Sequence, residues 1–129
     1  QMLSRTLQLS TEAAHALPVP IFVAGQFGGT EGYCEAIASG LYAALSVSAQ
    51  LNGEDAPLLP EETAFGALIA YATNPETQDY QPMHVNFGIM KPFEKKIRNK
   101  RERYAAYASR GDEKLRGYVE ALHKKGLIG

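Results

Sequence analysis

A short apolar segment, a glycine-rich loop and a helix follow one another near the start of this chain, and the segment lacks an obvious strand to pair with. Residues 20–24, Pro-Ile-Phe-Val-Ala, are apolar and β-branched and predict a buried strand. Residues 6–9 and 85–90 are weaker strand candidates. A parallel partner should follow the helix, but residues 53–62 are acidic and interrupted by proline. Because a buried strand must pair its backbone groups, its neighbours are expected in another part of a longer polypeptide or in a second copy of the chain within a homo-oligomer.

The rest of the sequence predicts helices. The first spans residues 33–51, is rich in small side chains suited to close packing, and carries one stripe formed by Ile37, Leu41, Leu45 and Ser48. A second helix opens at Pro60, since proline suits the first helical position. A basic helix follows Pro92, and Gly111 separates it from a last helix that ends at Lys125. These elements predict an α/β fragment that is mostly helical.

The composition is that of an ordinary globular protein. Of the 129 residues, 45% are hydrophobic and 21% are charged, which excludes a disordered or fibrous chain. No apolar run approaches the roughly 18 residues that cross a bilayer, so no membrane association and a cytoplasmic location are expected. The single cysteine, Cys34, cannot form an internal disulfide, which agrees with a reducing compartment. The first residue is glutamine rather than methionine, which favours a segment of a longer protein.

The formal net charge of −1 conceals two oppositely charged parts. Residues 1–90 contain one basic and nine acidic residues, whereas residues 91–129 contain twelve basic and five acidic residues. The run 91–103 alone holds seven basic and two acidic residues. Phosphates attract such a surface by releasing counterions, so the run is a candidate nucleic-acid surface. A solvated helix, or one that neutralises the acidic part of the chain, explains the charge equally well from the residues alone.

The loop between the predicted strand and the first helix contains Gly25, Gly28, Gly29 and Gly32. Its place before a helix exposes backbone N–H groups at the positive end of the helix dipole, and close glycines let a ligand approach without Cβ atoms in the way. An anionic or electron-rich ligand fits such a loop. The spacing is not the Gly-x-Gly-x-x-Gly dinucleotide fingerprint, however, and glycine loops also occur at simple turns. Ligand binding and a structural turn therefore both stay open on spacing alone.

Several blocks carry a more specific signal, and they are Ala24-Gly25-Gln26, Gly29, Glu31-Gly32-Tyr33, Ala38-Ser39-Gly40-Leu41, residues 60–68 (Pro-Glu-Glu-Thr-Ala-Phe-Gly-Ala-Leu), residues 81–88 (Gln-Pro-Met-His-Val-Asn-Phe-Gly) and residues 95–103 (Lys-Lys-Ile-Arg-Asn-Lys-Arg-Glu-Arg). In this order and with short gaps, they resemble the C-terminal third of the TrmFO family, which is similar in architecture to the GidA flavoproteins. The likeness runs from about Ile21 to Tyr107. Because separate blocks agree, it is far more specific than one glycine motif.

The resemblance implies part of a tRNA (uracil-5-)-methyltransferase, which reduces the methylene carbon of methylenetetrahydrofolate with flavin electrons and places it on carbon 5 of a T-loop uridine in tRNA. It implies FAD and methylenetetrahydrofolate as cofactors and NAD(P)H as reductant. Residues 1–53 would be the C-terminal strand-loop-helix part of a GidA-like FAD-binding domain, and residues 54–129 a helical C-terminal region with a basic surface. The family's main dinucleotide-binding motif and reactive cysteines lie in earlier segments. The missing N-terminal part of the same enzyme is therefore an expected partner, and this chain is expected to hold no catalytic residue.

The resemblance also assigns two groups of site residues. A helix N-terminus stabilises the negative charge of a reduced flavin, and the residues assigned to FAD are Gly25, Gln26, Gly29, Thr30, Glu31, Gly32 and Tyr33. A polyanionic substrate favours RNA contact for the basic run, and the residues assigned to tRNA are Lys95, Lys96, Arg98, Lys100, Arg101 and Arg103. For Tyr104, Tyr107 and Tyr118, stacking on bases and core packing both stay open.

Cys34 and the histidines are weaker candidates. A thiolate is favoured in the first turn of a helix, but the family usually has an aliphatic residue at this point, so Cys34 is expected to pack rather than react. His15, His84 and His123 are too far apart to suggest a metal site, and no metal is expected. His84 stands where asparagine is common in the family, and its role stays open.

The alternative to a methyltransferase function for this chain is a non-enzymatic RNA-binding or regulatory module.

Overall fold

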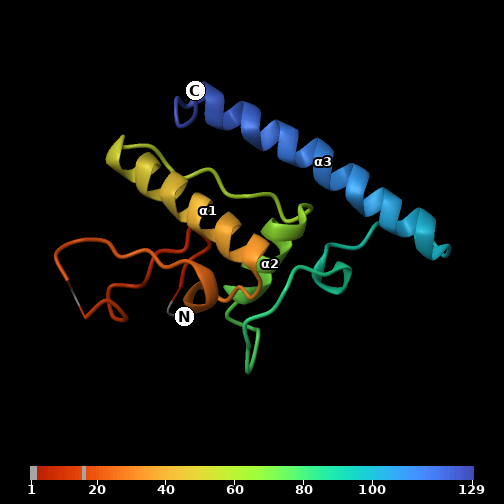
Figure 1. Cartoon of the computed structure of the whole chain (residues 1–129), viewed down its shortest axis with the longest axis horizontal. Coiled ribbons are helices and arrows are strands. Elements are labelled where there is room, and N and C mark those ends of the chain that lie inside the picture. The colour runs from red at the N-terminus through yellow and green to blue at the C-terminus, as the bar shows by residue number, and fades with distance from the viewer. Residues whose placement is uncertain (1–2, 16) are drawn as a thin grey trace.

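Three α-helices and two short 3-10 helices make up the regular structure of the computed structural model, which describes residues 3–15 and 17–129. They run in the order η1 (Gly25–Gly28), α1 (Tyr33–Leu51), α2 (Ala64–Ala72), η2 (Phe87–Ile89) and α3 (Lys100–Lys124) (Figure 1). No strand forms within these described ranges, so the fold is mostly helical as predicted but lacks the predicted β component. None of the described helices is long and apolar enough to span a membrane.

The strand predicted at residues 20–24 is wrong as an element of a sheet. Two backbone hydrogen bonds, of 2.8 and 3.0 Å, join residues 21–23 to residues 7–9 in one isolated antiparallel bridge. The pairing extends no further because Pro20 lacks an N–H on one side and η1 begins at Gly25 on the other. The weak strand candidate near the N-terminus thus supplies the one partner that this segment has within the described residues.

Helix α1 has the predicted bounds but buries a different face. Ile37 and Leu41, on the predicted stripe, are 72% and 63% exposed. The buried residues are instead small or hydrogen-bonded, and they are Glu35, Ser39, Tyr42, Ala43, Ser46 and Ala49. Polar side chains are tolerated there because each has a partner: the Ser39 hydroxyl, for example, accepts from Gly25 N–H at 2.7 Å. Small side chains let the N-terminal segment approach the helix closely, and this decides which face is covered.

Helix α2 begins at Ala64, later than the predicted start at Pro60, because Thr63 caps it. The Thr63 hydroxyl accepts from Gly66 N–H at 3.0 Å and donates to Pro60 O at 2.7 Å. Residues 60–63 therefore form a tight turn in place of a first helical turn. The helix buries Gly66, Ala67, Leu68 and Ile69.

Helix α3 is one continuous helix of 25 residues, so the predicted break at Gly111 and the predicted start after Pro92 are both wrong. The helix begins directly after Asn99, whose side-chain oxygen accepts from Glu102 N–H at 3.0 Å. A Cβ atom at Gly111 would lie 3.3 Å from Glu62 O, so glycine lets α3 pass close to the turn before α2. This packing offsets the cost of glycine inside a helix, which is about 1 kcal/mol.

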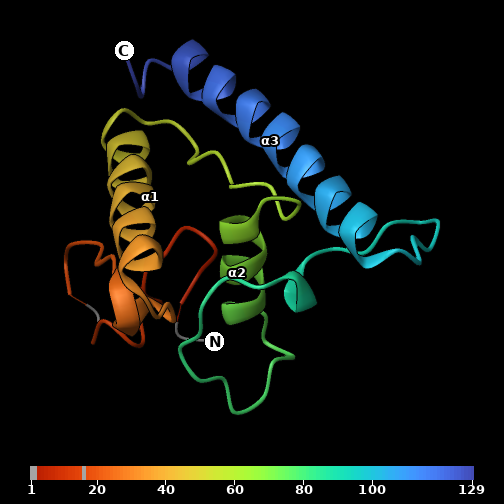
Figure 2. The same cartoon turned by 45° about the vertical axis from the view of Figure 1, so that its right-hand side comes forward.

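Two hydrophobic clusters hold the helices together, and α3 contributes to both. The main cluster comprises Leu7, Tyr42, Ala43, Leu59, Ile69, Tyr118 and Leu122. The smaller cluster comprises Ala67, Met90 and Tyr107. The N-terminal end of α3 extends past α1 and α2 together with residues 91–99, as two views of the ribbon show (Figures 1 and 2). The basic part of the chain is therefore carried on a projecting end of the molecule.

The buried phenol of Tyr118 should make the fold sensitive to alkali. Burial, with a smaller contribution from Tyr42, raises the pKa of Tyr118 to about 12. Because the unfolded chain loses this proton at lower pH, the stability that the neutral phenol contributes is present below the unfolded pKa and is lost as pH rises toward 12. We expect Tyr118→Phe to remove this part of the alkaline loss, at a cost of about 1 kcal/mol near neutral pH for the hydrogen bond to Pro57 O. Thermal unfolding measured between about pH 8 and 12 tests this; an unchanged alkaline profile would contradict it.

Candidate functional site

Residues 25–33, which lead into α1, form a compact turn that we call the glycine turn. η1 occupies its first part, and Gly29 and Gly32 then adopt left-handed backbone angles, with φ of +90° and +106°. These angles favour glycine over any other residue. Thr30 is buried between them, and its hydroxyl donates to Gly25 O at 2.9 Å. Thr30 therefore closes the turn on itself.

Residues 80–85, which we call the clasp, hold the glycine turn from a point 50 positions further along the chain. The Tyr80 hydroxyl donates to Gly29 O. Glu31 N–H donates to Met83 O at 3.0 Å, within an isolated parallel bridge. A Cβ atom at Gly29 would lie 3.0 Å from the Tyr80 ring, so the clasp needs glycine at this position. The glycine turn and the clasp form one structural unit.

Glu35, in the first turn of α1, is a second link between the glycine turn and the clasp. Its carboxylate accepts from Val85 N–H at 3.1 Å and lies 3.5 Å from His84 Nδ1. Hydrogen bonds from its own backbone N–H and from Val85 N–H lower the pKa of Glu35, against the opposing effect of burial. The carboxylate is thus charged at neutral pH and is engaged within the chain. A Cβ atom at Gly32 would displace the Glu35 carboxylate and His84 Nδ1, and the φ of +106° also favours glycine, so this position suits glycine whether or not a ligand binds.

The residues assigned to FAD all lie in the glycine turn, but they differ in what they offer a ligand. Thr30 is buried, and Gly29 and Gly32 contact the clasp. The prediction that close glycines make room for a ligand therefore does not hold for Gly29 and Gly32, which make room for the chain itself. Those that stay accessible are Gly25, Gln26, Glu31 and Tyr33. Contact of any of them with FAD stays a prediction.

The N-terminus of α1 offers groups that suit an anion. The N-cap residue is Gly32, which has no side chain to cap the helix, and within the described residues the N–H groups of Tyr33 and Cys34 have no acceptor. Free N–H groups at the start of a 19-residue helix carry the positive end of its dipole. Cys34 is itself exposed, so its predicted packing role is wrong within this chain.

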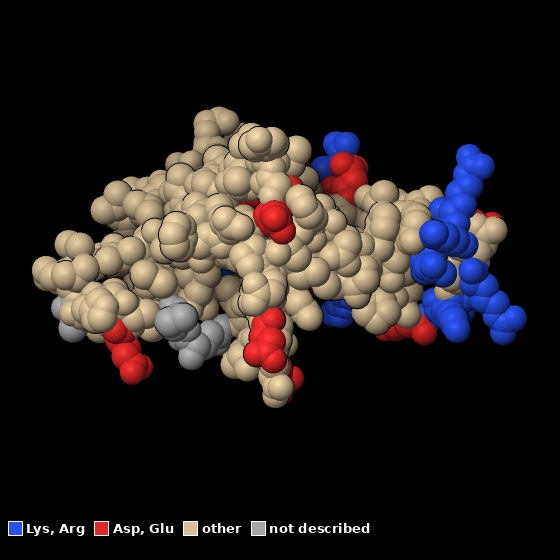
Figure 3. All heavy atoms as spheres, turned by 60° about the horizontal axis from the view of Figure 1, so that its bottom comes forward, with Lys and Arg blue, Asp and Glu red and all other residues tan. Residues whose placement is uncertain are grey.

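Residues 91–103 form a basic surface at one end of the molecule (Figure 3). The charges do not follow one helix, because residues 91–99 are a loop and only the last part belongs to α3. Of the residues assigned to tRNA, all but Arg103 are exposed. None of them forms an ion pair within the part of the chain that the structure describes. Neutralisation of the acidic part of the chain therefore does not explain this surface.

Aromatic side chains gather beside the basic surface. Phe87, in η2, stacks on Tyr104 with ring centroids 4.2 Å apart and planes at 10°. Tyr107 also contacts Phe87 but is buried in the smaller cluster. Tyr118 is buried in the main cluster. Core packing is therefore the role of Tyr107 and Tyr118, whereas Tyr104 lies at the margin of the core next to the cations.

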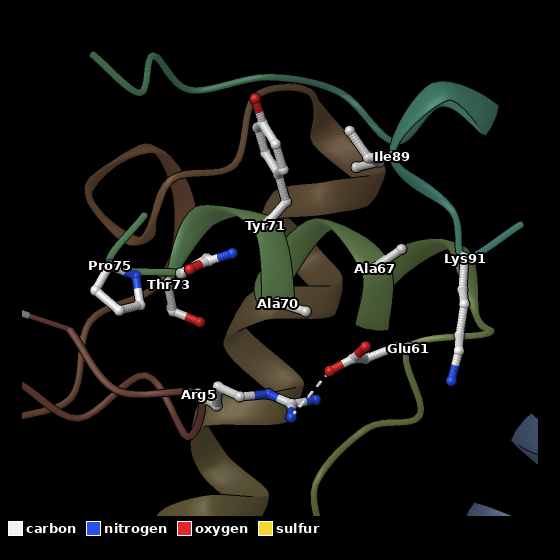
Figure 4. Close-up of a pocket in the computed structure, with 10 residues that line it drawn as sticks. Arg5, Glu61, Ala67, Ala70, Tyr71, Thr73, Pro75, Ile89 and Lys91 are labelled. Atoms are coloured by element: carbon white, nitrogen blue, oxygen red, sulfur yellow. Dashed lines mark ion pairs between the residues drawn. The ribbon is translucent and has the colours of Figure 1, made fainter. Parts of the chain in front are cut away.

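A cavity of about 450 Å³ lies along α2, away from the residues assigned to either ligand (Figure 4). Arg5 and Glu61 face each other in it and form an ion pair of 3.1 Å. Lys91 lines the same cavity from the loop after η2. Because Glu61 offsets the charge of Arg5, the cavity has no strong preference for an anion, and we assign it no ligand. Among residues 3–15 and 17–129, no three His, Cys, Asp or Glu side chains gather at a metal-binding distance.

Two features of the site are not predicted from the sequence. The clasp is one, because no local pattern connects residues 80–85 with the glycine turn. The other is the start of α3, for which a signal existed: Asn99 stands three residues before Glu102, a spacing typical of a helix N-terminus.

Comparison with known proteins gives two kinds of match. A family model described as Glucose inhibited division protein A matches residues 3–55. Proteins named methylenetetrahydrofolate–tRNA-(uracil-5-)-methyltransferase TrmFO are similar over a longer stretch. The one from Bacillus cytotoxicus is 44% identical over 99 residues, covering 77% of this chain and 23% of the relative. The one from Bacillus pumilus is 43% identical over 102 residues, covering 79% of this chain and 24% of the relative.

These matches agree with the resemblance seen in the sequence blocks. The family model covers the glycine turn and α1, and the TrmFO relatives cover about three quarters of the chain. The chain spans about a quarter of the length of the curated relatives it matches. It is therefore homologous to the TrmFO/GidA family over 77% of its own length.

Proposed function

We propose that this chain is the C-terminal part of a tRNA (uracil-5-)-methyltransferase that uses methylenetetrahydrofolate and reduced FAD to methylate a T-loop uridine. In this proposal the chain contributes to FAD and tRNA binding and does not catalyse alone. The observation that carries the proposal is the 44% identity over 99 residues to proteins named for this reaction. The open helix N-terminus and the unneutralised basic surface support it independently.

The glycine turn fits a flavin through its accessible part. The free N–H groups of Tyr33 and Cys34 would face the anionic edge of a reduced flavin, where the helix dipole stabilises negative charge. Gly25 leaves open space for a ring to approach. The clasp and Glu35 would hold the turn in shape rather than touch the ligand. Bound FAD supplies the electrons that reduce the transferred carbon.

The proposal divides the chain into two parts. Residues 1–53 would complete the FAD-binding domain, and residues 54–129 would pack on it and present the basic surface. Methylenetetrahydrofolate and NAD(P)H would meet groups of the N-terminal part of the enzyme, which the 23% coverage of the relatives leaves outside this chain. Lys100, Arg101 and Arg103 stand at the positive end of the α3 dipole, where cations are unfavourable without an anionic partner. A tRNA backbone would supply that partner.

Reconstitution with the missing part of the enzyme tests the proposal. We expect this chain, mixed with the part of Bacillus cytotoxicus TrmFO outside the matched region, to retain FAD and to methylate a tRNA transcript. Neither piece should do so alone. The measurements are flavin fluorescence after gel filtration and transfer of labelled carbon from methylenetetrahydrofolate to tRNA. A mixture without FAD and without activity would favour the non-enzymatic RNA-binding module instead.

A pair of variants locates the flavin contact in the same mixture. Tyr33 and Leu51 stand at opposite ends of α1 and are 92% and 83% exposed. We expect Tyr33→Ala to weaken FAD retention roughly tenfold, the scale of one lost aromatic contact, and Leu51→Ala to leave it unchanged. Equal retention in the two variants would place the flavin elsewhere.

A further inference from the structure

A second cavity, of about 440 Å³, opens between η2 and the start of α3. Its walls are mainly apolar and include Val85, Phe87, Met90 and Tyr104. We call it the aromatic pocket. Phe87 is 41% exposed although its ring stacks on Tyr104 at 4.2 Å, so part of this residue stays accessible beside the cavity. A partly exposed aromatic pair that lines a cavity suits an occupant that tolerates close ring contact.

Two cations of α3 lie beside Tyr104, which lines this pocket. Lys100 Nζ and the Arg103 guanidinium each lie 5.5 Å from the centre of the Tyr104 ring. Neither cation has a carboxylate partner among the described residues. The pocket thus combines a ring-binding surface with positive charge at its rim. An occupant that joins a flat apolar ring to an anionic group within a few ångströms matches both features.

We propose that the aromatic pocket binds an unstacked nucleobase of an RNA strand whose phosphates lie on Lys100 and Arg103. This inference rests on the proposed tRNA contact and adds to it a subsite that reads the base rather than the backbone. Base stacking on aromatic side chains is the usual way in which single-stranded RNA is held, and phosphate contacts accompany it. A purely apolar occupant, such as a side chain of a protein partner, would leave the charges of Lys100 and Arg103 without an anionic partner.

The polar groups of the pocket indicate how selective it is. The Asn86 side chain accepts from Gly88 N–H at 2.9 Å and donates to His84 O at 3.2 Å, so both ends of the amide are engaged. No free side-chain amide in the pocket is then left to read a base edge. The pocket should therefore accept different bases with similar affinity, because every base has a face that stacks.

Paired oligonucleotides separate base stacking from phosphate contact. The full chain is titrated into a fluorescein-labelled RNA 12-mer of uridines and into an abasic strand with the same number of phosphates. We expect wild-type protein to bind the uridine strand more tightly, and Phe87→Leu to lose roughly 5- to 150-fold for that strand, the range for one stacked base. Binding of the abasic strand should not change. Phe87→Tyr, which keeps the ring, should restore binding.

The control is Tyr71→Leu, because Tyr71 is an aromatic residue of nearly equal exposure, 42%, on α2 and outside the pocket. It should bind both strands as wild type does. Circular dichroism checks the fold of each variant. Quenching of 2-aminopurine placed in the RNA gives a reading on the wild-type protein alone, and unquenched fluorescence in the bound state would overturn the proposal.

The remaining outcomes separate the proposed base site from the proposed tRNA contact on which it rests. If wild type binds both strands equally and Phe87→Leu changes neither, the basic surface contacts phosphates and the pocket is not a base site. If wild type binds neither strand, the tRNA surface itself is wrong and the pocket proposal is overturned with it.

Discussion

Replacing Gly66 with alanine is expected to unfold α2 and most of the molecule with it. A Cβ atom at this position would overlap Pro60 O and would lie 2.7 Å from the Pro60 carbonyl carbon and 2.6 Å from Thr63 Oγ1. These atoms belong to the turn that caps α2, so no flexible side chain can move aside. We expect a loss of about 4 kcal/mol or more in the free energy of unfolding, the range of severe core defects. Urea denaturation followed by circular dichroism measures it.

Gly40→Ala is the matched control for this substitution. Gly40 also lies inside a helix, α1, but a Cβ atom there would meet nothing within 4 Å. Alanine should therefore stabilise the chain by about 1 kcal/mol, because it restricts the unfolded chain and favours the helix. Similar unfolding midpoints for the two variants would show that residues 60–63 do not press against Gly66.

Reversing Lys95, Lys96 and Arg98 to glutamate is expected to weaken binding of a tRNA transcript by roughly 10- to 100-fold at low salt. These residues are exposed and form no ion pair within the described part of the chain, so the fold should tolerate the change. Each lost phosphate contact also reduces the dependence of the logarithm of affinity on the logarithm of salt concentration by about one. Titrations between about 50 and 200 mM salt give both quantities.

The control reverses Lys114, Arg116 and Lys124, which lie further along α3 and change the net charge by the same amount. If total charge alone governs binding, the two triple variants will weaken it equally. If the basic surface is the RNA contact, only the first will. Unchanged affinity in the first variant would remove the basic surface from the proposal.

The structural features that were predicted correctly from the sequence are those that local interactions determine. The bounds of α1 follow from Gly32 before it and Asn52-Gly53 after it, and the structure confirms them. The mostly helical character also follows from local patterns. The family was recognisable because several blocks agreed in order, and the comparisons confirm that homology.

Contacts between distant segments account for what local patterns did not predict. Gly111 reads as a helix break, but α3 continues because the glycine packs against Glu62 O. Ile37 was predicted to be buried, but Glu35 and Ser39 are covered instead, since the backbone N–H groups of Val85 and Gly25 satisfy them. The glycine turn reads as open, but its shape depends on the clasp. In each case the deciding partner lies far away in the sequence.

The clasp has a consequence for the order in which the molecule assembles. Its contacts with Gly29 and Glu35 close a loop of some 50 residues. The chain loses conformational entropy when this loop closes, and only then do the contacts contribute their stabilisation. Helix α1, built from contacts between near neighbours, needs no such closure. We therefore expect the glycine turn to reach its final geometry in a late kinetic phase, after the helices have formed, so that the proposed flavin contact would be the last part of the chain to take shape.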